Sequence, residues 1–99
     1  DAEAPEVIQE SDDVWLLDGS LPLDEVREAI GCEVLPRGDG YHTLAGLVLN
    51  QLGEIPSGGE QFALEGYRFE VVGMDGRRIE QVRVRRLESA EAAEAAERV

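Results

Sequence analysis

The sequence predicts a small α+β domain in which two short helices pack on an antiparallel or mixed sheet. Two segments, 22–30 and 43–52, place their apolar residues at helical spacing. Three later segments, 60–65, 67–74 and 78–87, are separated by turn sequences, and 67–74 alternates apolar with charged residues as a half-buried antiparallel strand does. A length of 99 residues with 42% hydrophobic content fits one domain with one modest core.

The first half of the chain is expected to contain a strand and a helix. The apolar run 14–17 is followed by Asp18-Gly19, which predicts a strand and then a turn. Ser20 is expected to cap the helix over 22–30, and Gly31 is expected to end it.

The segment 43–52 is apolar around most of its circumference. Thr43 is expected to cap this helix, Gly53 to end it, and Pro56 to prevent it from resuming. A helix of this kind needs cover on more than one side, so we expect it to form the centre of the core or part of an interface. The predicted interface residues are Trp15, Leu44, Leu47, Val48, Leu49 and Leu52.

Turn chemistry organises the second half of the chain. Glu65-Gly66 separates the first two strands, and Asp75-Gly76 is a typical two-residue hairpin sequence between the second and third. Ile79 and Val82 are out of phase for one face of a strand, so we predict a bulge at 80–81.

Both ends of the chain are expected to lie outside the packed domain. Residues 1–12 are predicted to be an acidic linker, within which Val7 and Ile8 form a short edge strand. Residues 88–99 are an Ala/Glu-rich tail, predicted to be helical or frayed. The first residues are acidic and lack an initiator Met, so we expect a fragment of a longer protein without a signal peptide.

Charge and composition exclude several classes of function. A formal net charge of −13 argues against nucleic acid as a partner, because phosphates require a basic surface. No apolar run approaches the roughly 18 residues of a membrane-spanning helix, so we expect a soluble fragment that does not insert in the membrane. The single Cys32 excludes an internal disulfide and is compatible with a reducing compartment.

Catalysis by this chain is not expected. His42 is the only histidine, and no Ser or Cys is placed by the sequence as its nucleophilic partner. Cys32 lies ten positions from it across a glycine-rich segment, which is not a metal-ligand spacing. We therefore predict no enzyme activity, no catalytic residue and no metal site.

The arginines near the C-terminal strand are the one basic cluster. On a strand, Arg83 and Arg85 project to the face opposite Val82 and Val84. One interpretation is a surface for anions or an acidic partner. The other is cross-strand pairing with Glu65, Glu70 or Glu80, which is worth only about 0.2–1 kcal/mol per pair.

Three segments in order resemble the CorC/HlyC transporter-associated domain. They are LDGSLPLDE from Leu17, YHTLAGLVL from Tyr41, and YRFEVV from Tyr67 continued by MDGRRI and VRV. The resemblance extends from about Asp13 to Leu87, which we take as a domain over 13–87. At position 42, His stands where the family often has an acidic residue.

This resemblance implies a fold similar to part of a flavin-dinucleotide-binding fold of the PCMH-like type. It also implies a location at the C-terminus of hemolysin-like membrane proteins linked to magnesium and cobalt efflux. In such proteins a transmembrane domain and a pair of CBS modules come first. The domain would then lie at the cytoplasmic face of the inner membrane.

Three functions are weighed on this basis. The first is a regulatory or interaction module that acts through a homodimer and through the CBS modules. The second is a small-ligand domain for flavin (FAD) or an adenine nucleotide, although the chain shows no G-x-G-x-x-G sequence. Its phosphate-facing residues would be Gly58, Gly59, Arg77, Arg78, Arg83 and Arg85. The third is a Mg²⁺ or Ca²⁺ sensor, but EF-hand spacing is absent and carboxylates near helix starts are expected anyway.

Overall fold

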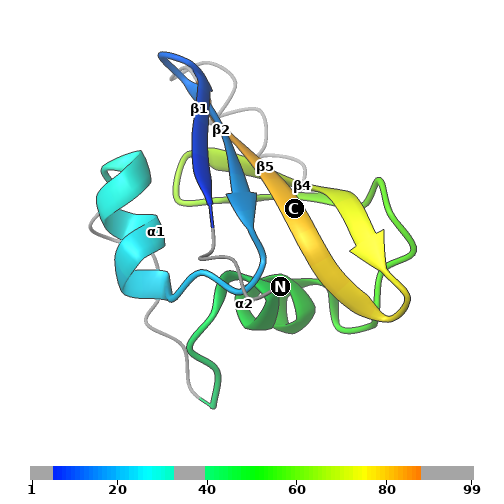
Figure 1. The fold of residues 1–99 in the computed structure, drawn as a ribbon. Coiled ribbons are helices and arrows are strands. Elements are labelled where there is room, and N and C mark those ends of the chain that lie inside the picture. Colours follow the sequence, from blue (N-terminus) through cyan, green and yellow to red (C-terminus); the bar gives the residue numbers. More distant parts are fainter. Residues whose placement is uncertain (1–5, 33–39, 88–99) are drawn as a thin grey trace.

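A computed structural model describes residues 6–32 and 40–87. Within them, a five-stranded sheet in the order β1-β2-β5-β4-β3 carries two helices (Figure 1). Every strand pair is antiparallel, so the sheet is not mixed. The elements are β1 (Val7–Ser11), β2 (Val14–Asp18), α1 (Leu23–Ile30), α2 (Leu44–Leu52), β3 (Gln61–Leu64), β4 (Tyr67–Asp75) and β5 (Arg78–Arg86).

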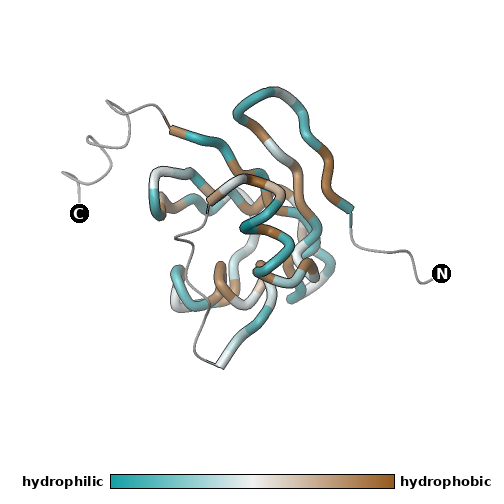
Figure 2. Tube along the Cα trace, turned by 90° about the vertical axis from the view of Figure 1, so that its left-hand side faces the viewer, coloured by the Kyte–Doolittle hydropathy of each residue, from teal (hydrophilic) through white to brown (hydrophobic). Residues whose placement is uncertain are grey.

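The core lies between the two helices and one face of the sheet. Hydrophobic residues recur along the strands and both helices (Figure 2), and every second side chain is buried along β2 and along β4 as far as Val71. Phe69, Val82 and Val84 from the sheet are fully buried together with Val26 of α1 and Leu47 of α2. Neither of the two described helices lies on the opposite sheet face, and its described side chains are half-buried or exposed.

The crossing segment, residues 18–23, joins the sheet to both helices. The Gly19 N–H donates to the Glu80 carbonyl at 2.9 Å, and the Gly19 carbonyl accepts from the Ala45 N–H at 2.8 Å. The Leu21 carbonyl accepts from the Leu44 N–H at 2.9 Å. A Cβ on Gly19 would lie 2.3 Å from the Ile79 carbonyl oxygen, so only glycine fits there.

The predicted cap of α1 is wrong. The Ser20 N–H and hydroxyl both bond Asp18 Oδ1, at 2.8 and 2.7 Å, which closes the turn after β2 instead. The N-cap of α1 is Pro22, without a side-chain cap bond, and Gly31 ends the helix in the left-handed conformation as predicted. Ser20 bonds to the Asp18 side chain, two residues before it, and lies two residues before the N-cap Pro22.

The predicted ends of α2 are confirmed. The Thr43 hydroxyl accepts from the Gly46 N–H at 3.2 Å, and Gly53 has a φ of 77°. The first two helical N–H groups, those of Leu44 and Ala45, donate to carbonyls of the crossing segment. The N-terminus of α2 is therefore satisfied by this chain's own backbone.

The β4–β5 hairpin confirms the predicted bulge. Val71 pairs with Val82, Gly73 with Gln81 and Met74 with Ile79, so Val72 is an extra residue on β4 and Glu80 is one on β5. The hairpin loop is shifted by one residue from the expected position. Asp75 pairs with Arg78, which leaves Gly76 and Arg77 as the loop.

The N-terminal edge strand is longer than expected. β1 extends over Val7–Ser11 and pairs with β2, with a bulge between Gln9 and Ser11. Part of the predicted linker is therefore a strand. The rest of the linker before residue 6, and the Ala/Glu-rich tail 88–99, lie outside the described residues. In the described part of the chain, neither helix has the length and apolar character needed to cross a membrane.

A carboxylate holds the loop before β3. Glu60 accepts hydrogen bonds from the N–H groups of Ser57 and Gly58, at 2.9 and 2.8 Å, and from the Ser57 hydroxyl at 3.3 Å. The bond from the Ser57 N–H is the main cause that lowers the pKa of Glu60 below its ordinary value. The φ values of 115° at Gly58 and 90° at Gly59 let the loop fold around this carboxylate.

We predict that Gly19→Ala lowers the free energy of unfolding by about 3 kcal/mol, the upper end of overpacking costs. The cause is contact with a backbone oxygen that no side-chain rotation relieves. Urea denaturation measures the change. The adjacent Ser20→Ala, which removes only the hydroxyl bond to Asp18 and keeps the backbone N–H bond, is expected to cost about 1 kcal/mol. Equal losses in the two variants would contradict a tightly packed crossing.

We predict that Glu60 contributes stability that depends on pH. Because its folded pKa is lowered, the contribution is present above the unfolded pKa and is lost as the pH falls through the folded pKa. Glu60→Gln should destabilise the domain at pH 7 and have little effect in strong acid. Glu54→Gln, the same charge change at an exposed position, is the control. A Glu60 titration by NMR at or above the ordinary glutamate pKa would contradict this.

Candidate functional site

The six residues predicted to face a nucleotide do not converge. Gly58 and Gly59 lie in the loop before β3, where the Gly58 N–H donates to Glu60 and the Gly59 N–H donates to the Val71 carbonyl at 2.7 Å. Arg77 lies in the hairpin loop and Arg78 begins β5, while Arg83 and Arg85 lie on the open sheet face. A phosphate at the glycines would have to displace a carboxylate of the same chain.

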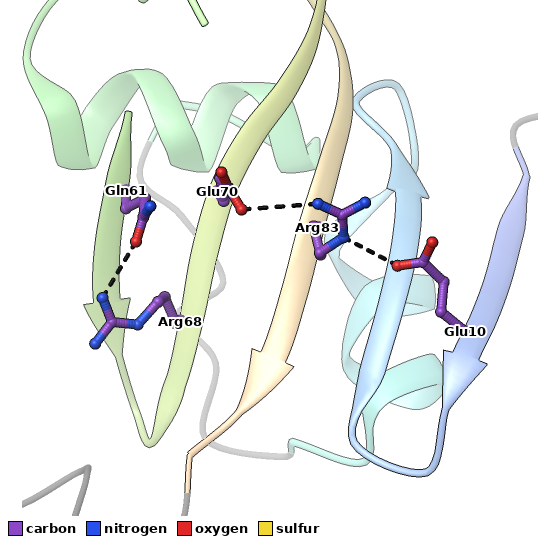
Figure 3. Close-up of polar contacts among 5 residues, drawn as sticks. All are labelled: Glu10, Gln61, Arg68, Glu70 and Arg83. Atoms are coloured by element: carbon purple, nitrogen blue, oxygen red, sulfur yellow. Dashed lines mark hydrogen bonds and ion pairs between the residues drawn. The ribbon is translucent and has the colours of Figure 1, made fainter. Parts of the chain in front are cut away.

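Arg83 is held between two carboxylates on the open sheet face (Figure 3). Its Nε donates to Glu10 Oε1 at 3.0 Å, and its Nη1 lies 3.8 Å from Glu70 Oε1. The bond to Glu10 is the main cause that raises the pKa of Arg83 further above its ordinary value. The neighbouring Arg68 donates to Gln61 at 3.2 Å. The predicted cross-strand pairing with Glu70 is thus confirmed for Arg83.

Arg86 has a structural position beside the core. Its guanidinium lies 5.4 Å from the centroid of the Trp15 ring and 6.0 Å from that of Tyr67. Arg86 Nη2 and the Tyr67 hydroxyl both donate to the Ile30 carbonyl, at 3.4 and 3.0 Å. The C-terminus of α1 is therefore fixed to β4 and β5, and Trp15 contributes to that packing rather than to a surface.

A groove crosses the end of β1, β2 and β5. Its volume is about 240 Å³, below the roughly 300–1,000 Å³ of typical ligand pockets. Carboxylates of Glu6, Asp18 and Glu80 line it, and they would repel the phosphates of a dinucleotide. Asp18 Oδ1 is already bonded to Ser20. In the described segments, no group of three or more His, Cys, Asp or Glu side chains is arranged to hold a metal ion.

The two candidate reactive side chains, His42 and Cys32, differ in their exposure to solvent. His42 is exposed, and its carbonyl accepts from the Leu23 N–H at 2.9 Å. Cys32 is buried in the core at 4% exposure.

Four of the six predicted interface residues belong to the domain's own core. Trp15 is 4% exposed, and Leu44, Leu47 and Val48 are fully buried. Their assignment to an interface is corrected, because one small sheet and two helices already enclose them. Leu49 is 37% exposed, whereas Leu52 is partly buried and packs against the core.

The surface of α2 carries a stripe of apolar residues, here called the α2 stripe. It consists of Ala45, Leu49 and Leu52, which share one helical face at spacings of four and three. Ile55, which follows the end of α2, is 46% exposed. Sequence reasoning assigned no role to Ile55, which lies between the exposed Glu54 and the buried Pro56.

This region is also free of charge. Residues 41–53 contain no Asp, Glu, Lys or Arg, whereas the chain's 31% of charged residues would place about four there. A surface helix normally presents charged residues to water. The exposed residues of α2 are Leu49, Asn50 and Gln51, and none of them is charged.

Comparison with known proteins identifies the family. The CorC_HlyC family, described as the transporter associated domain, matches residues 8–88. A UPF0053 protein of Synechocystis is 45% identical over 87 residues, which cover 86% of this chain and 19% of that protein. The polyamine export protein of Escherichia coli K12 is 32% identical over 84 residues, covering 85% of this chain and 19% of that protein.

Solved structures agree with this assignment. The CorC_HlyC domain of a Xylella fastidiosa Temecula1 hemolysin has a TM-score of 0.73 and 38% identity, with 87% of this chain and 100% of that chain covered. A region of Neisseria meningitidis MC58 named for a Mg²⁺ and Co²⁺ transporter (CorC) has a TM-score of 0.72 and 25% identity, with 82% and 98% covered. This chain spans about a fifth of the length of the curated relatives it matches. It belongs to the CorC_HlyC family of transporter-associated domains, which is not a catalytic family.

Proposed function

We propose that this chain is a non-catalytic regulatory module of a membrane cation-efflux protein and acts at the cytoplasmic face of the membrane. It modulates transport through contacts with a second copy and with the CBS modules and transmembrane domain of the same parent protein. Family membership and the names of the relatives support the link to transport. In this proposal the domain carries neither the cargo nor the transport energy.

The observation that carries the proposal is the exposed, uncharged surface of α2. Leu49 is 37% exposed on a helix without charged residues, in a chain of net charge −13. An apolar surface of this kind is typical of a site that is covered by another protein surface. A regulatory module needs such contacts, because coupling between sites requires a physical interaction that differs between two states.

The cargo class in the proposal is a cation. The E. coli relative is named for polyamine export, and the Neisseria neighbour for Mg²⁺ and Co²⁺. The rival function, a flavin or adenine-nucleotide binder with a flavin-dinucleotide-like fold, lacks comparable support. The glycine loop is filled by Glu60, and the groove is small and lined by carboxylates.

A domain exchange tests this function. The matching 84-residue segment of the E. coli polyamine export protein is deleted or replaced by this domain, and export of polyamine, Mg²⁺ and Co²⁺ is measured separately in cells. We expect deletion to change the export of at least one cation by about fivefold or more, the low end of coupling between sites, and the replacement to restore it.

Two matched variants of the replacement domain test whether the α2 stripe is needed for the restored regulation. Leu49→Lys in the α2 stripe should remove the restored regulation, whereas Val72→Lys on β4 should not. The two variants are matched because both side chains are 37% exposed. Membrane levels of each protein are measured alongside. A deletion that reaches the membrane and leaves all three cation exports unchanged would refute the proposed function.

A further inference from the structure

We infer that β1 is a releasable strand. It leaves the sheet as a unit while the rest of the domain stays folded, and the ion pair of Glu10 with Arg83 favours its paired state. This inference rests on the proposed function, in which CBS modules come before this domain in the parent protein. Paired and released β1 are then the two states through which those modules change the position of the domain.

β1 adds no side chain to the core. All five of its residues are exposed, and its two apolar side chains, Val7 and Ile8, are 46% and 42% exposed. Among the described residues, the core and the partly buried side chains packed against it include none from β1. Burial of apolar surface is the dominant favourable contribution to folding. Release of β1 therefore breaks backbone hydrogen bonds, but it takes no side chain out of the core.

The opposite edge of the sheet is held differently. β3 is the other edge strand. Its Phe62 ring stacks on the Phe69 ring of β4 at a centroid distance of 5.0 Å, and Phe62 and Leu64 both pack against the core. Beside the beginning of β1, by contrast, Glu6 and Ile8 line the groove of about 240 Å³. Of the two edges, β1 is thus the one that opens at the lower cost.

An exposed ion pair links β1 to the centre of the sheet. Glu10 Oε1 accepts from Arg83 Nε of β5 at 3.0 Å, across the intervening β2 (Figure 3). The two side chains are 37% and 41% exposed. Ion pairs with this exposure change an equilibrium constant by about two- to fivefold. The pair therefore favours the paired state of β1 without preventing its release.

The turn between β1 and β2 is the hinge of this movement. The Arg86 N–H donates to the Asp13 carbonyl at 2.7 Å, and Arg86 Nη1 donates to Asp13 Oδ1 at 3.4 Å. A bulge between Gln9 and Ser11 interrupts the pairing of β1 just before this turn. Because the turn stays bonded to β5, β1 is released from its Val7 end. Its five residues then add about 17 Å of extended chain, at roughly 3.4 Å per residue.

The hydrogen bonds of β2 alternate between its two neighbours and so report on each side separately. The Asp18 N–H donates to the Glu6 carbonyl, on the β1 side, at 3.1 Å. In an antiparallel ladder, residues that bond to the same neighbouring strand recur at every second position. The N–H groups of Leu16 and Asp18 therefore face β1. Those of Trp15 and Leu17 face β5.

Native-state hydrogen exchange of the whole chain, followed by NMR at low urea concentrations, tests the inference. We expect the opening that exposes the Leu16 and Asp18 amides to be at least about tenfold more populated than the opening that exposes the Trp15 and Leu17 amides. Two outcomes would overturn the inference. One is the same population for all four amides, which means that β1 leaves only when the domain unfolds. The other is fast exchange of Asp18 with slow exchange of Leu16, which means that only the end of the strand frays.

Glu10→Gln tests the ion pair, and Glu54→Gln is the matched control at another exposed carboxylate. Glu10→Gln should raise the population of the opening at Leu16 about two- to fivefold and leave that at Leu17 unchanged. Glu54→Gln should match the wild type at both amides. No change at Leu16, or equal changes at Leu16 and Leu17, would also overturn the inference, because Glu10 would then not act on β1 alone.

The two proposals can fail separately. If β1 exchanges only with the whole domain while deletion of the matching segment still changes cation export, the inference falls and the proposed function stands. If β1 is released locally but that deletion leaves all three cation exports unchanged, the proposed function falls and the releasable strand remains a property of the fold.

Discussion

The structure depends on the backbone of the crossing segment. Gly19 donates to the Glu80 carbonyl at the β5 bulge and accepts from Ala45 at the start of α2, so one residue joins sheet and helix. Leu21 and Leu23 add hydrogen bonds to Leu44 and to the His42 carbonyl. These bonds supply partners for N–H groups that a helix start otherwise leaves unpaired. A side chain at position 19 would separate the layers, because the Ile79 carbonyl occupies its place.

This constraint explains how α2 remains free of charge. Helix starts commonly recruit acidic residues or bound anions to satisfy their N–H groups and dipole. Here the crossing segment and Thr43 satisfy them, so no acidic residue is needed in the first turn of α2. The same bonds fill the position that an anion would take. The hydrogen bonds of the crossing segment are therefore structural.

The local features of the fold followed from the sequence, whereas the long-range features did not. Thr43, Gly31 and Gly53 act within one helical turn, so their roles could be predicted from neighbouring residues. The ion pair of Arg83 with Glu10 joins residues far apart in the chain, and it requires β1 to pair with β2 and β2 with β5. No local pattern specifies that order.

The predicted interface also shows that local sequence patterns do not specify long-range packing. The apolar pattern of α2 predicted cover on more than one side of the helix, but it could not say which side the sheet covers. Leu44, Leu47 and Val48 are buried in the core, whereas Leu49 is 37% exposed. The Trp15 ring packs beside the Tyr67 ring and under the Arg86 guanidinium, and both of these residues are far from Trp15 in the sequence. Burial is a property of the whole topology, so sequence periodicity alone overestimates the interface.

Charge distribution connects the fold to its interactions. In the described residues, all arginines except Arg27 lie on β4, β5 and their loop, while acidic residues are spread over most other elements. A mostly acidic surface discourages nonspecific association with other acidic molecules and with anionic membranes. An uncharged stripe within such a surface gains selectivity from that repulsion, because only a partner that fits the stripe and avoids the surrounding carboxylates can approach it. Weak apolar attraction is then sufficient for a specific contact, since the competing contacts are made unfavourable by charge.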